Sequence, residues 1–250
     1  MTTTISCGNI VPVLNEKRSY MNIQGLQKLT LLDFPGKTAC TIFTGGCNLR
    51  CPFCHNSPLV INPPKESAYS EEEIFAFLNK RKGIIDGVAI TGGEPLMQPD
   101  IKEFIIKLRE MGCAVKLDTN GTYPDKLKDL VNNNLVDYVA MDVKSSEVGY
   151  PQCVGIGGYK IDKIKESIAF LLEGNVPYEF RTTVADGLHT IEDIRGIGEL
   201  IKGADKHYIQ AFKDSGDLIG FGLAPFSKQQ MLEMKDIMSE YVKFCDVRGL

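Results

Sequence analysis

Apolar residues recur with two different spacings along this chain, and from Lys37 onward the two patterns alternate. Short runs rich in Val, Ile and Thr indicate buried strands, whereas apolar residues three and four apart indicate amphipathic helices. The predicted strands are Thr38–Thr44, Gly87–Thr91, Ala114–Asp118, Val136–Val143, Tyr178–Val184 and Lys206–Ala211. The predicted helices are about Ser70–Lys82, Pro99–Met111, Pro124–Asn133, Asp162–Glu173, Ile191–Ile201 and Ser227–Phe244.

Two helix boundaries are marked by particular residues. Ser70 and Glu73 have the spacing of a capping box, in which each side chain bonds the backbone of the other residue. Gly112 follows the apolar stripe of the Pro99–Met111 helix. We expect it to end that helix, because glycine readily adopts the left-handed conformation found there.

Strands separated by helices predict an α/β fold with a parallel sheet. Six β/α units are too few to close an eight-stranded barrel, so we expect an open (β/α)6 partial barrel. A doubly wound open sheet is the alternative, and in both folds the functional side chains lie at the carboxyl ends of the strands. We expect residues 23–250 to form a single domain and residues 1–22 to be a poorly ordered extension.

Composition narrows the classes of function. The chain has 250 residues, of which 43% are hydrophobic, enough for one sizeable core. A formal net charge of −4 gives no electrostatic basis for binding DNA or RNA, and no apolar run is long enough to predict a membrane span. The first residues lack the basic start and apolar block of a signal peptide, so we expect a cytoplasmic protein with reduced thiols.

Candidate chemistry begins with Cys47, Cys51 and Cys54, which have the spacing C-x3-C-x2-C just after the first predicted strand. Ordinary iron–sulfur clusters take four cysteine ligands, so three thiolates leave one iron open to a substrate or cofactor. A structural zinc site is the alternative, but it usually takes four ligands. His55 adjoins Cys54 and has poor reach for closing a zinc tetrahedron, and Cys40 reads as a core residue of the strand.

Polar motifs also follow the other predicted strands. They are Thr91-Gly92-Gly93-Glu94-Pro95, Asp118-Thr119-Asn120-Gly121, Asp142-Val143-Lys144, Arg181-Thr182-Thr183 and Gln210. Glycines let a ligand approach the backbone closely, and the Glu94 carboxylate could accept hydrogen bonds from an ammonium group. Asp142 and Lys144 point to the same side of an extended chain, which suits either a ribose hydroxyl and a carboxylate or a plain salt bridge at the rim.

These motifs, together with the chain from Leu29–Gly36 through the cysteine loop to Asn56, resemble the radical S-adenosylmethionine (SAM) superfamily. Within it, they are most similar to the activases of glycyl-radical enzymes. The similarity is greatest to the activating proteins of anaerobic ribonucleoside-triphosphate reductase, with pyruvate formate-lyase activase a near relative. In weaker form it extends to about Gln210.

The resemblance implies a role for each motif. Cys47, Cys51 and Cys54 would ligate a [4Fe-4S] cluster, and SAM would chelate its fourth iron. The remaining implied SAM contacts are Phe53, near adenine; Gly92, Gly93 and Glu94, which receive the methionine amino group; Asp118 and Thr119, near a monovalent cation; Asp142 and Lys144, near the ribose and carboxylate; Arg181, facing the active site; and Gln210, in place of an adenine-side histidine.

By the same resemblance, the reduced cluster cleaves SAM to a 5′-deoxyadenosyl radical that abstracts hydrogen from a glycine of a partner enzyme, such as anaerobic ribonucleotide reductase. A flavodoxin or ferredoxin would donate the electron. No cysteine-rich insert lies between Asn56 and Val88, so a single cluster is predicted. Lys213–Phe226 is either a flap that contacts the partner or a plain connection.

Two other functions remain open from the sequence. One is a radical SAM enzyme that acts on a small molecule, such as a 7-carboxy-7-deazaguanine synthase that contracts a pterin ring. The other is a zinc or iron–sulfur module used only for binding. The polar motifs on one rim argue against a module without catalytic activity.

Overall fold

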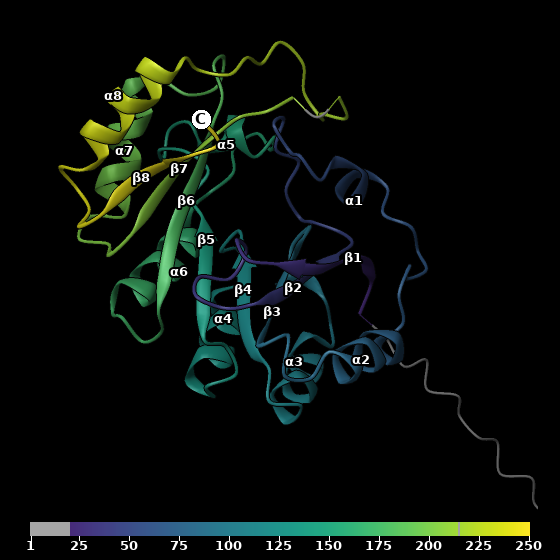
Figure 1. Cartoon of the computed structure of the whole chain (residues 1–250). Helices are drawn as coiled ribbons and strands as arrows, with labels where there is room; N and C mark the ends of the chain where they lie inside the picture. The colour runs from purple at the N-terminus through teal and green to yellow at the C-terminus, as the bar shows by residue number, and fades with distance from the viewer. Residues whose placement is uncertain (1–20, 215) are drawn as a thin grey trace, which may run out of the picture.

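One eight-stranded sheet organises the molecule, and its strand order follows the sequence (Figure 1). The computed structural model describes residues 21–214 and 216–250. The strands are β1 (Ile23–Thr30), β2 (Ala39–Thr44), β3 (Gly87–Gly92), β4 (Ala114–Thr119), β5 (Tyr138–Asp142), β6 (Tyr178–Val184), β7 (His207–Ala211) and β8 (Cys245–Arg248). β1 is antiparallel to β2, and every later neighbouring pair is parallel.

Helices connect the parallel strands. They are α1 (Ser57–Ile61), α2 (Glu71–Lys80), α3 (Ile101–Glu110), α4 (Pro124–Asn132), α5 (Tyr150–Cys153), α6 (Asp162–Leu172), α7 (Ile191–Leu200) and α8 (Lys228–Met238), with a 3-10 turn at Pro95–Met97. Right-handed crossovers between strands in sequential order place their helices on one face of a sheet. Accordingly, α7 and α8 lie together against the β7–β8 end of the sheet (Figure 1).

The open partial barrel predicted from the sequence is confirmed. A doubly wound sheet would reverse its strand order at some point, and this sheet runs from β1 to β8 without a reversal. The six predicted strands correspond to β2 to β7, with bounds that agree within two residues. The Ser70–Glu73 capping box is present, and Gly112 has a φ of +83° just beyond α3.

Two edge strands lie outside the sequence prediction. β1 has apolar residues three apart, at Ile23, Leu26 and Leu29, and therefore lacks the alternation that marks a strand. β8 begins directly after Phe244, where the last predicted helix was expected to end. That expectation was wrong, because α8 ends at Met238.

Backbone pairing with a distant segment explains the early end of α8. The amide of Gly203 donates to the carbonyl of Tyr241 at 2.9 Å, and the amide of Lys243 donates to the carbonyl of Ala204 at 2.9 Å. These bonds draw the chain after α8 alongside the segment that enters β7. The chain is then already in place to pair with β7 as β8.

The predicted extension falls mostly outside the described residues. Residues 1–20 are not described, but Met21 is buried in the core and the Asn22 amide donates to Gln98 Oε1 at 3.0 Å. Across residues 21–214 and 216–250, no helix has the length and apolar character needed to span a membrane.

Side chains alternate between the two faces of the parallel strands. Leu117, Val139, Phe180 and Ile209 are fully buried in the apolar core. Asp118, Arg181 and Gln210, each one residue further along its strand, and Asp142, three residues after Val139, instead line a cavity on the inner face. Because successive side chains of a strand point to opposite faces, one pattern builds both the core and a polar inner wall.

An aromatic contact lies at the amino ends of the strands. Phe34, from the loop between β1 and β2, packs against Tyr138 at the start of β5, with ring centroids 6.4 Å apart. Both side chains are buried. The cavity on the inner face lies at the other end, where the strands have their carboxyl ends.

Candidate active site

A cavity of about 250 Å³ lies at the carboxyl ends of the parallel strands. It is lined by Cys47, Leu49, Cys51, Phe53, Cys54, His55, Asn56, Val60, Thr91, Gly92, Gly93, Asp118, Thr119, Asn120, Asp142, Lys144, Arg181, Thr183 and Gln210. The structure thus brings together on one cavity every residue predicted for the site except Glu94.

The loop that carries the three cysteines is held by backbone hydrogen bonds to segments distant in sequence. The Gly46 amide donates to the carbonyl of Leu59 at 2.7 Å. The Arg50 amide donates to the carbonyl of Val154, just after α5, at 2.9 Å. Anchored at both points, the loop presents its sulfur atoms toward the strand ends.

Burial raises the pKa of all three thiols on the cavity. For Cys51 it rises to about 12, and for Cys47 and Cys54 the shift has the same direction and the same main cause. A thiol needs a strong nearby positive charge to ionise in such surroundings, and bound metal supplies it. Three thiols on one cavity fit the donor set of an iron–sulfur cluster with an open iron. In the described part of the chain, no three His, Cys, Asp or Glu side chains are arranged to hold a single metal ion.

The glycine pair after β3 has a packing role that the sequence did not indicate. A Cβ at Gly92 would lie 2.3 Å from the backbone nitrogen of Thr44, and one at Gly93 would lie 1.9 Å from the carbonyl oxygen of Gly46. Only glycine lets the end of β3 lie this close to the start of the cysteine loop. The Glu94 amide then donates to the Gly46 carbonyl at 2.8 Å.

Glu94 points into the protein and not into the cavity. Its carboxylate is fully buried and accepts hydrogen bonds from the Thr119 hydroxyl at 2.8 Å, the Asn120 amide at 2.7 Å and the Leu96 amide at 3.0 Å. The carboxylate therefore joins the end of β3 to the end of β4. The predicted contact between the Glu94 side chain and an ammonium group stays a prediction.

Burial raises the pKa of Glu94 to about 7, despite these three donors. A carboxyl group whose pKa is higher in the folded protein stabilises the fold below its unfolded pKa and loses that contribution as the pH rises through the folded value. We therefore expect the stability of the wild type, relative to Glu94→Gln, to fall by up to about 3 kcal/mol between about pH 4.5 and 7. Urea unfolding of both proteins across this range measures the difference, and parallel pH curves would contradict it.

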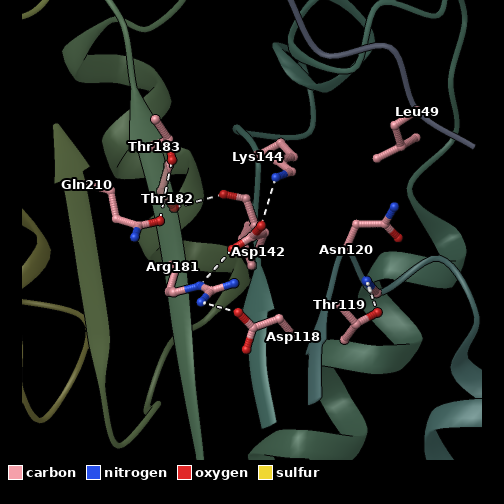
Figure 2. Close-up of polar contacts among 12 residues, drawn as sticks. Leu49, Asp118, Thr119, Asn120, Asp142, Lys144, Arg181, Thr182, Thr183 and Gln210 are labelled. Carbon is pink, nitrogen blue, oxygen red and sulfur yellow. Dashed lines mark hydrogen bonds and ion pairs between the residues drawn. The ribbon is translucent and has the colours of Figure 1, made fainter. Parts of the chain in front are cut away.

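Four charged side chains, from three strands and the segment just after β5, form one continuous chain across the cavity (Figure 2). Arg181 on β6 donates to Asp118 through Nη1 at 2.9 Å and to Asp142 through Nε at 2.8 Å. Lys144 donates to the other oxygen of Asp142 at 2.9 Å. Asp142 and Lys144 thus form the salt bridge that the sequence left open, and both also line the cavity.

Opposite charges keep these groups ionised although they are buried. Burial by itself would raise the pKa of both aspartates, but Arg181 with Lys116 holds the pKa of Asp118 below its usual value, and Arg181 with Lys144 does the same for Asp142. Burial would lower the pKa of Lys144, and the charge of Asp142 raises it instead. The cavity therefore offers a fixed arrangement of charges at neutral pH.

Lys116, on the inner face of β4, was not among the predicted site residues. It is buried and donates to Asp118 Oδ1, so both oxygens of that carboxylate are engaged by cations of the protein. The neighbouring Thr119 hydroxyl donates to Glu94 and accepts from the Gly121 amide at 3.1 Å. A monovalent cation at Asp118 and Thr119 would have to share these oxygens with the protein's own donors and cations.

Phe53 and His189 support Lys144 from the side of the cysteine loop. The Phe53 ring is buried, lies edge-on to His189 with centroids 5.9 Å apart, and has the Lys144 ammonium 5.9 Å from its centroid. His189 Nε2 lies 2.9 Å from the Lys144 carbonyl oxygen. Sequence reasoning missed His189, because nothing local marks a histidine in the loop after β6.

The segment Lys213–Phe226 crosses from the end of β7 to the cysteine loop. The Gly220 amide donates to the Pro52 carbonyl at 2.8 Å, and Asp186 and Ala224 form a β-bridge. Phe221 is 96% exposed on this segment. A role in contacting a partner stays a prediction.

Several residues on the cavity carry no assignment from the sequence. Thr183 lies two residues after Arg181 and shares its face, a relationship that strand alternation predicts. Asn120 lies in the motif after β4, but that motif alone does not show which way an amide side chain points. Leu49, His55 and Asn56 reach the cavity through the fold of the cysteine loop, which has no periodic signal.

A family model and several known proteins match this sequence. The family model of the Radical SAM superfamily matches residues 41–201. A protein of Methanocaldococcus jannaschii, named as a glycyl-radical enzyme activating enzyme, is 35% identical over 235 residues, covering 91% of this chain and 96% of the relative. The pyruvate formate-lyase-activating enzyme of Clostridium pasteurianum is 27% identical over 191 residues, covering 74% of this chain and 79% of that enzyme.

Among solved structures, SuiB of Streptococcus suis bound to its precursor peptide SuiA has a similar fold. Its TM-score is 0.65 at 14% sequence identity, and the match covers 84% of this chain. The chain spans 48% of the length of SuiB, so the similarity concerns the fold of the shared part.

Proposed function

This chain belongs to the radical SAM superfamily, and we propose that it installs the radical on a glycyl-radical enzyme, with anaerobic ribonucleoside-triphosphate reductase as the first candidate partner. The family uses a [4Fe-4S] cluster and SAM. The observation that carries the proposal is the similarity to an activating enzyme over nearly the whole of both chains. The identity of the partner rests on the motif resemblance.

In this proposal, Cys47, Cys51 and Cys54 hold the cluster on the wall of the cavity that faces the strand ends. When bound, the reduced cluster and SAM supply a 5′-deoxyadenosyl radical for hydrogen abstraction. The protein holds and orients these groups, while the cofactors carry the chemistry.

The proposed SAM contacts follow from the fixed charges of the cavity. Lys144, held between Asp142 and the Phe53 ring, suits the SAM carboxylate, and Asp142 suits a ribose hydroxyl. The backbone of Gly92 and Gly93 would receive the amino group, since the Glu94 side chain is engaged elsewhere. Because these groups are positioned before binding, little reorganisation is needed at the moment of reaction.

In this proposal the substrate is a macromolecule that approaches the cavity at the carboxyl ends of the strands. The glycine to be activated would enter as part of a peptide loop that reaches this cavity. An electron donor such as flavodoxin or ferredoxin would reduce the cluster before this step.

Electron paramagnetic resonance tests the function directly. Anaerobically reconstituted protein, mixed with SAM, a reductant and anaerobic ribonucleotide reductase, is expected to produce the doublet of a glycyl radical. Lys144→Ala should slow its formation by about a hundredfold, because it removes a positioned charge from the cavity. The exposed Lys243 pairs with Asp205 at the surface, so Lys243→Ala is the matched control. A silent spectrum with every candidate reductase, together with turnover of a pterin substrate, would favour the small-molecule alternative instead.

A further inference from the structure

Asn120 places an amide donor against one of the three cavity sulfurs. Its Nδ2 lies 3.7 Å from Cys47 Sγ, and the side chain is almost completely buried. In Figure 2, Asn120 and Leu49 lie on the side of the site opposite Arg181. The amide of Leu49 also donates to Cys47 Sγ, at 3.4 Å.

The orientation of the Asn120 amide is fixed by its other contacts. Its Oδ1 accepts from the Thr122 amide at 3.0 Å and from the Thr122 hydroxyl at 2.7 Å. A backbone N–H can only donate, so the oxygen must face Thr122 and the NH₂ group must face the sulfur.

Counting the donor hydrogens leads to the same arrangement. One Nδ2 hydrogen bonds Asn48 Oδ1 at 3.0 Å, and Asn48 Nδ2 in turn donates to the Thr122 hydroxyl at 2.9 Å. Asn48, Thr122 and Asn120 thus form a closed ring in which every side-chain bond runs in one direction. The second Nδ2 hydrogen of Asn120 is left for Cys47 Sγ.

The three sulfurs are therefore in unequal surroundings. Cys47 receives two N–H donors, and the backbone amide of Asn56 lies against Cys54. Cys51 Sγ accepts no N–H hydrogen bond from the residues that the structure describes.

We propose that Asn120 is a hydrogen-bond donor to the Cys47 ligand of the cluster and raises the reduction potential of the cluster. This inference rests on the proposed function, because it requires the three cysteines to hold a cluster. Hydrogen bonds to the ligand sulfurs are among the factors that set such potentials. A donor stabilises the reduced cluster more than the oxidised one, because reduction increases the negative charge on the sulfurs.

The test measures the midpoint potential of anaerobically reconstituted protein without SAM, by a titration followed by electron paramagnetic resonance. Asn120→Leu removes the donor without adding charge. At a fixed applied potential we expect the ratio of reduced to oxidised cluster to fall by about threefold to tenfold, where tenfold corresponds to about 59 mV for a one-electron couple. Asn120→Asp keeps the acceptor for Thr122 and should shift the potential further in the negative direction.

Thr122→Val is the matched control. It breaks the same ring but leaves the Thr122 amide on Asn120 Oδ1, so the potential should stay at the wild-type value. Resonance Raman spectra in H₂O and D₂O should show an isotope shift of the Fe–S stretches that Asn120→Leu reduces and Thr122→Val retains. Unchanged potentials in both Asn120 variants with full iron content would overturn the inference. If Asn120→Leu loses its cluster, an unchanged midpoint potential in Asn120→Asp with full iron content would overturn the inference. Failure of the wild type to bind iron would contradict the proposed function instead.

Discussion

Cys51→Ser is expected to leave the protein without an intact cluster and without detectable 5′-deoxyadenosine. Cys51 is the most buried of the three cavity cysteines, and burial raises its pKa to about 12. A serine hydroxyl in the same place ionises far less readily and is a harder donor than the sulfur that iron–sulfur clusters require. Loss of one ligand of three removes a third of the protein attachment, so we expect activity to fall below detection. Iron analysis, the absorbance of the reconstituted protein and chromatography of the products measure this result.

Cys113→Ala is the matched control for that experiment. Cys113 is also buried, but it lies between α3 and β4, away from the cavity, and should be dispensable for iron binding. We expect this variant to hold about four irons, as the wild type should. Full iron content in Cys51→Ser would contradict the assignment and would direct attention to His55, which lines the same cavity.

Arg181→Met is expected to lower the free energy of unfolding by about 3–5 kcal/mol and to abolish measurable SAM binding. Arg181 connects two buried aspartates from different strands, and its removal leaves Asp118 with Lys116 alone and Asp142 with Lys144 alone. Arg181→Lys should recover little of the loss, because one ammonium group cannot replace donors at both Nε and Nη1. Urea unfolding and calorimetric titration with SAM measure the two effects.

The pH dependence of the Arg181→Met deficit follows from the pKa values of the two aspartates. Arg181 holds both below their ordinary values, so its stabilising effect is complete above the unfolded pKa of about 4 and is lost as the pH falls through the folded values. We therefore expect the full deficit at pH 7 and a smaller one below about pH 4. Arg109→Met, which breaks a partly exposed pair with Asp137, is the control and should cost about 1 kcal/mol or less. Equal stability of the two variants would contradict the structural role of Arg181.

Much of the fold could be predicted from the sequence, because its signals are local. Parallel strands such as β6 are short runs bounded by turns, and the bounds of β6 agree with the prediction. The capping box at Ser70 involves residues three apart and needs no tertiary contact. β1, β8 and the end of α8 could not be predicted, because backbone pairing between distant segments determines them.

For the candidate site, too, some features could be predicted from the sequence and others depend on contacts between distant segments. The sequence by itself determined which chemical groups follow each strand, because strand ends in a parallel sheet meet at one edge regardless of side-chain detail. The sequence was therefore enough to predict that the three cysteines and the polar residues after the strands lie together at one edge of the sheet. Only the tertiary structure decided the partner of each group, since partners come from different strands and depend on their register. Arg181 between two aspartates, Glu94 turned into the protein and Asn120 facing Cys47 are all of this kind.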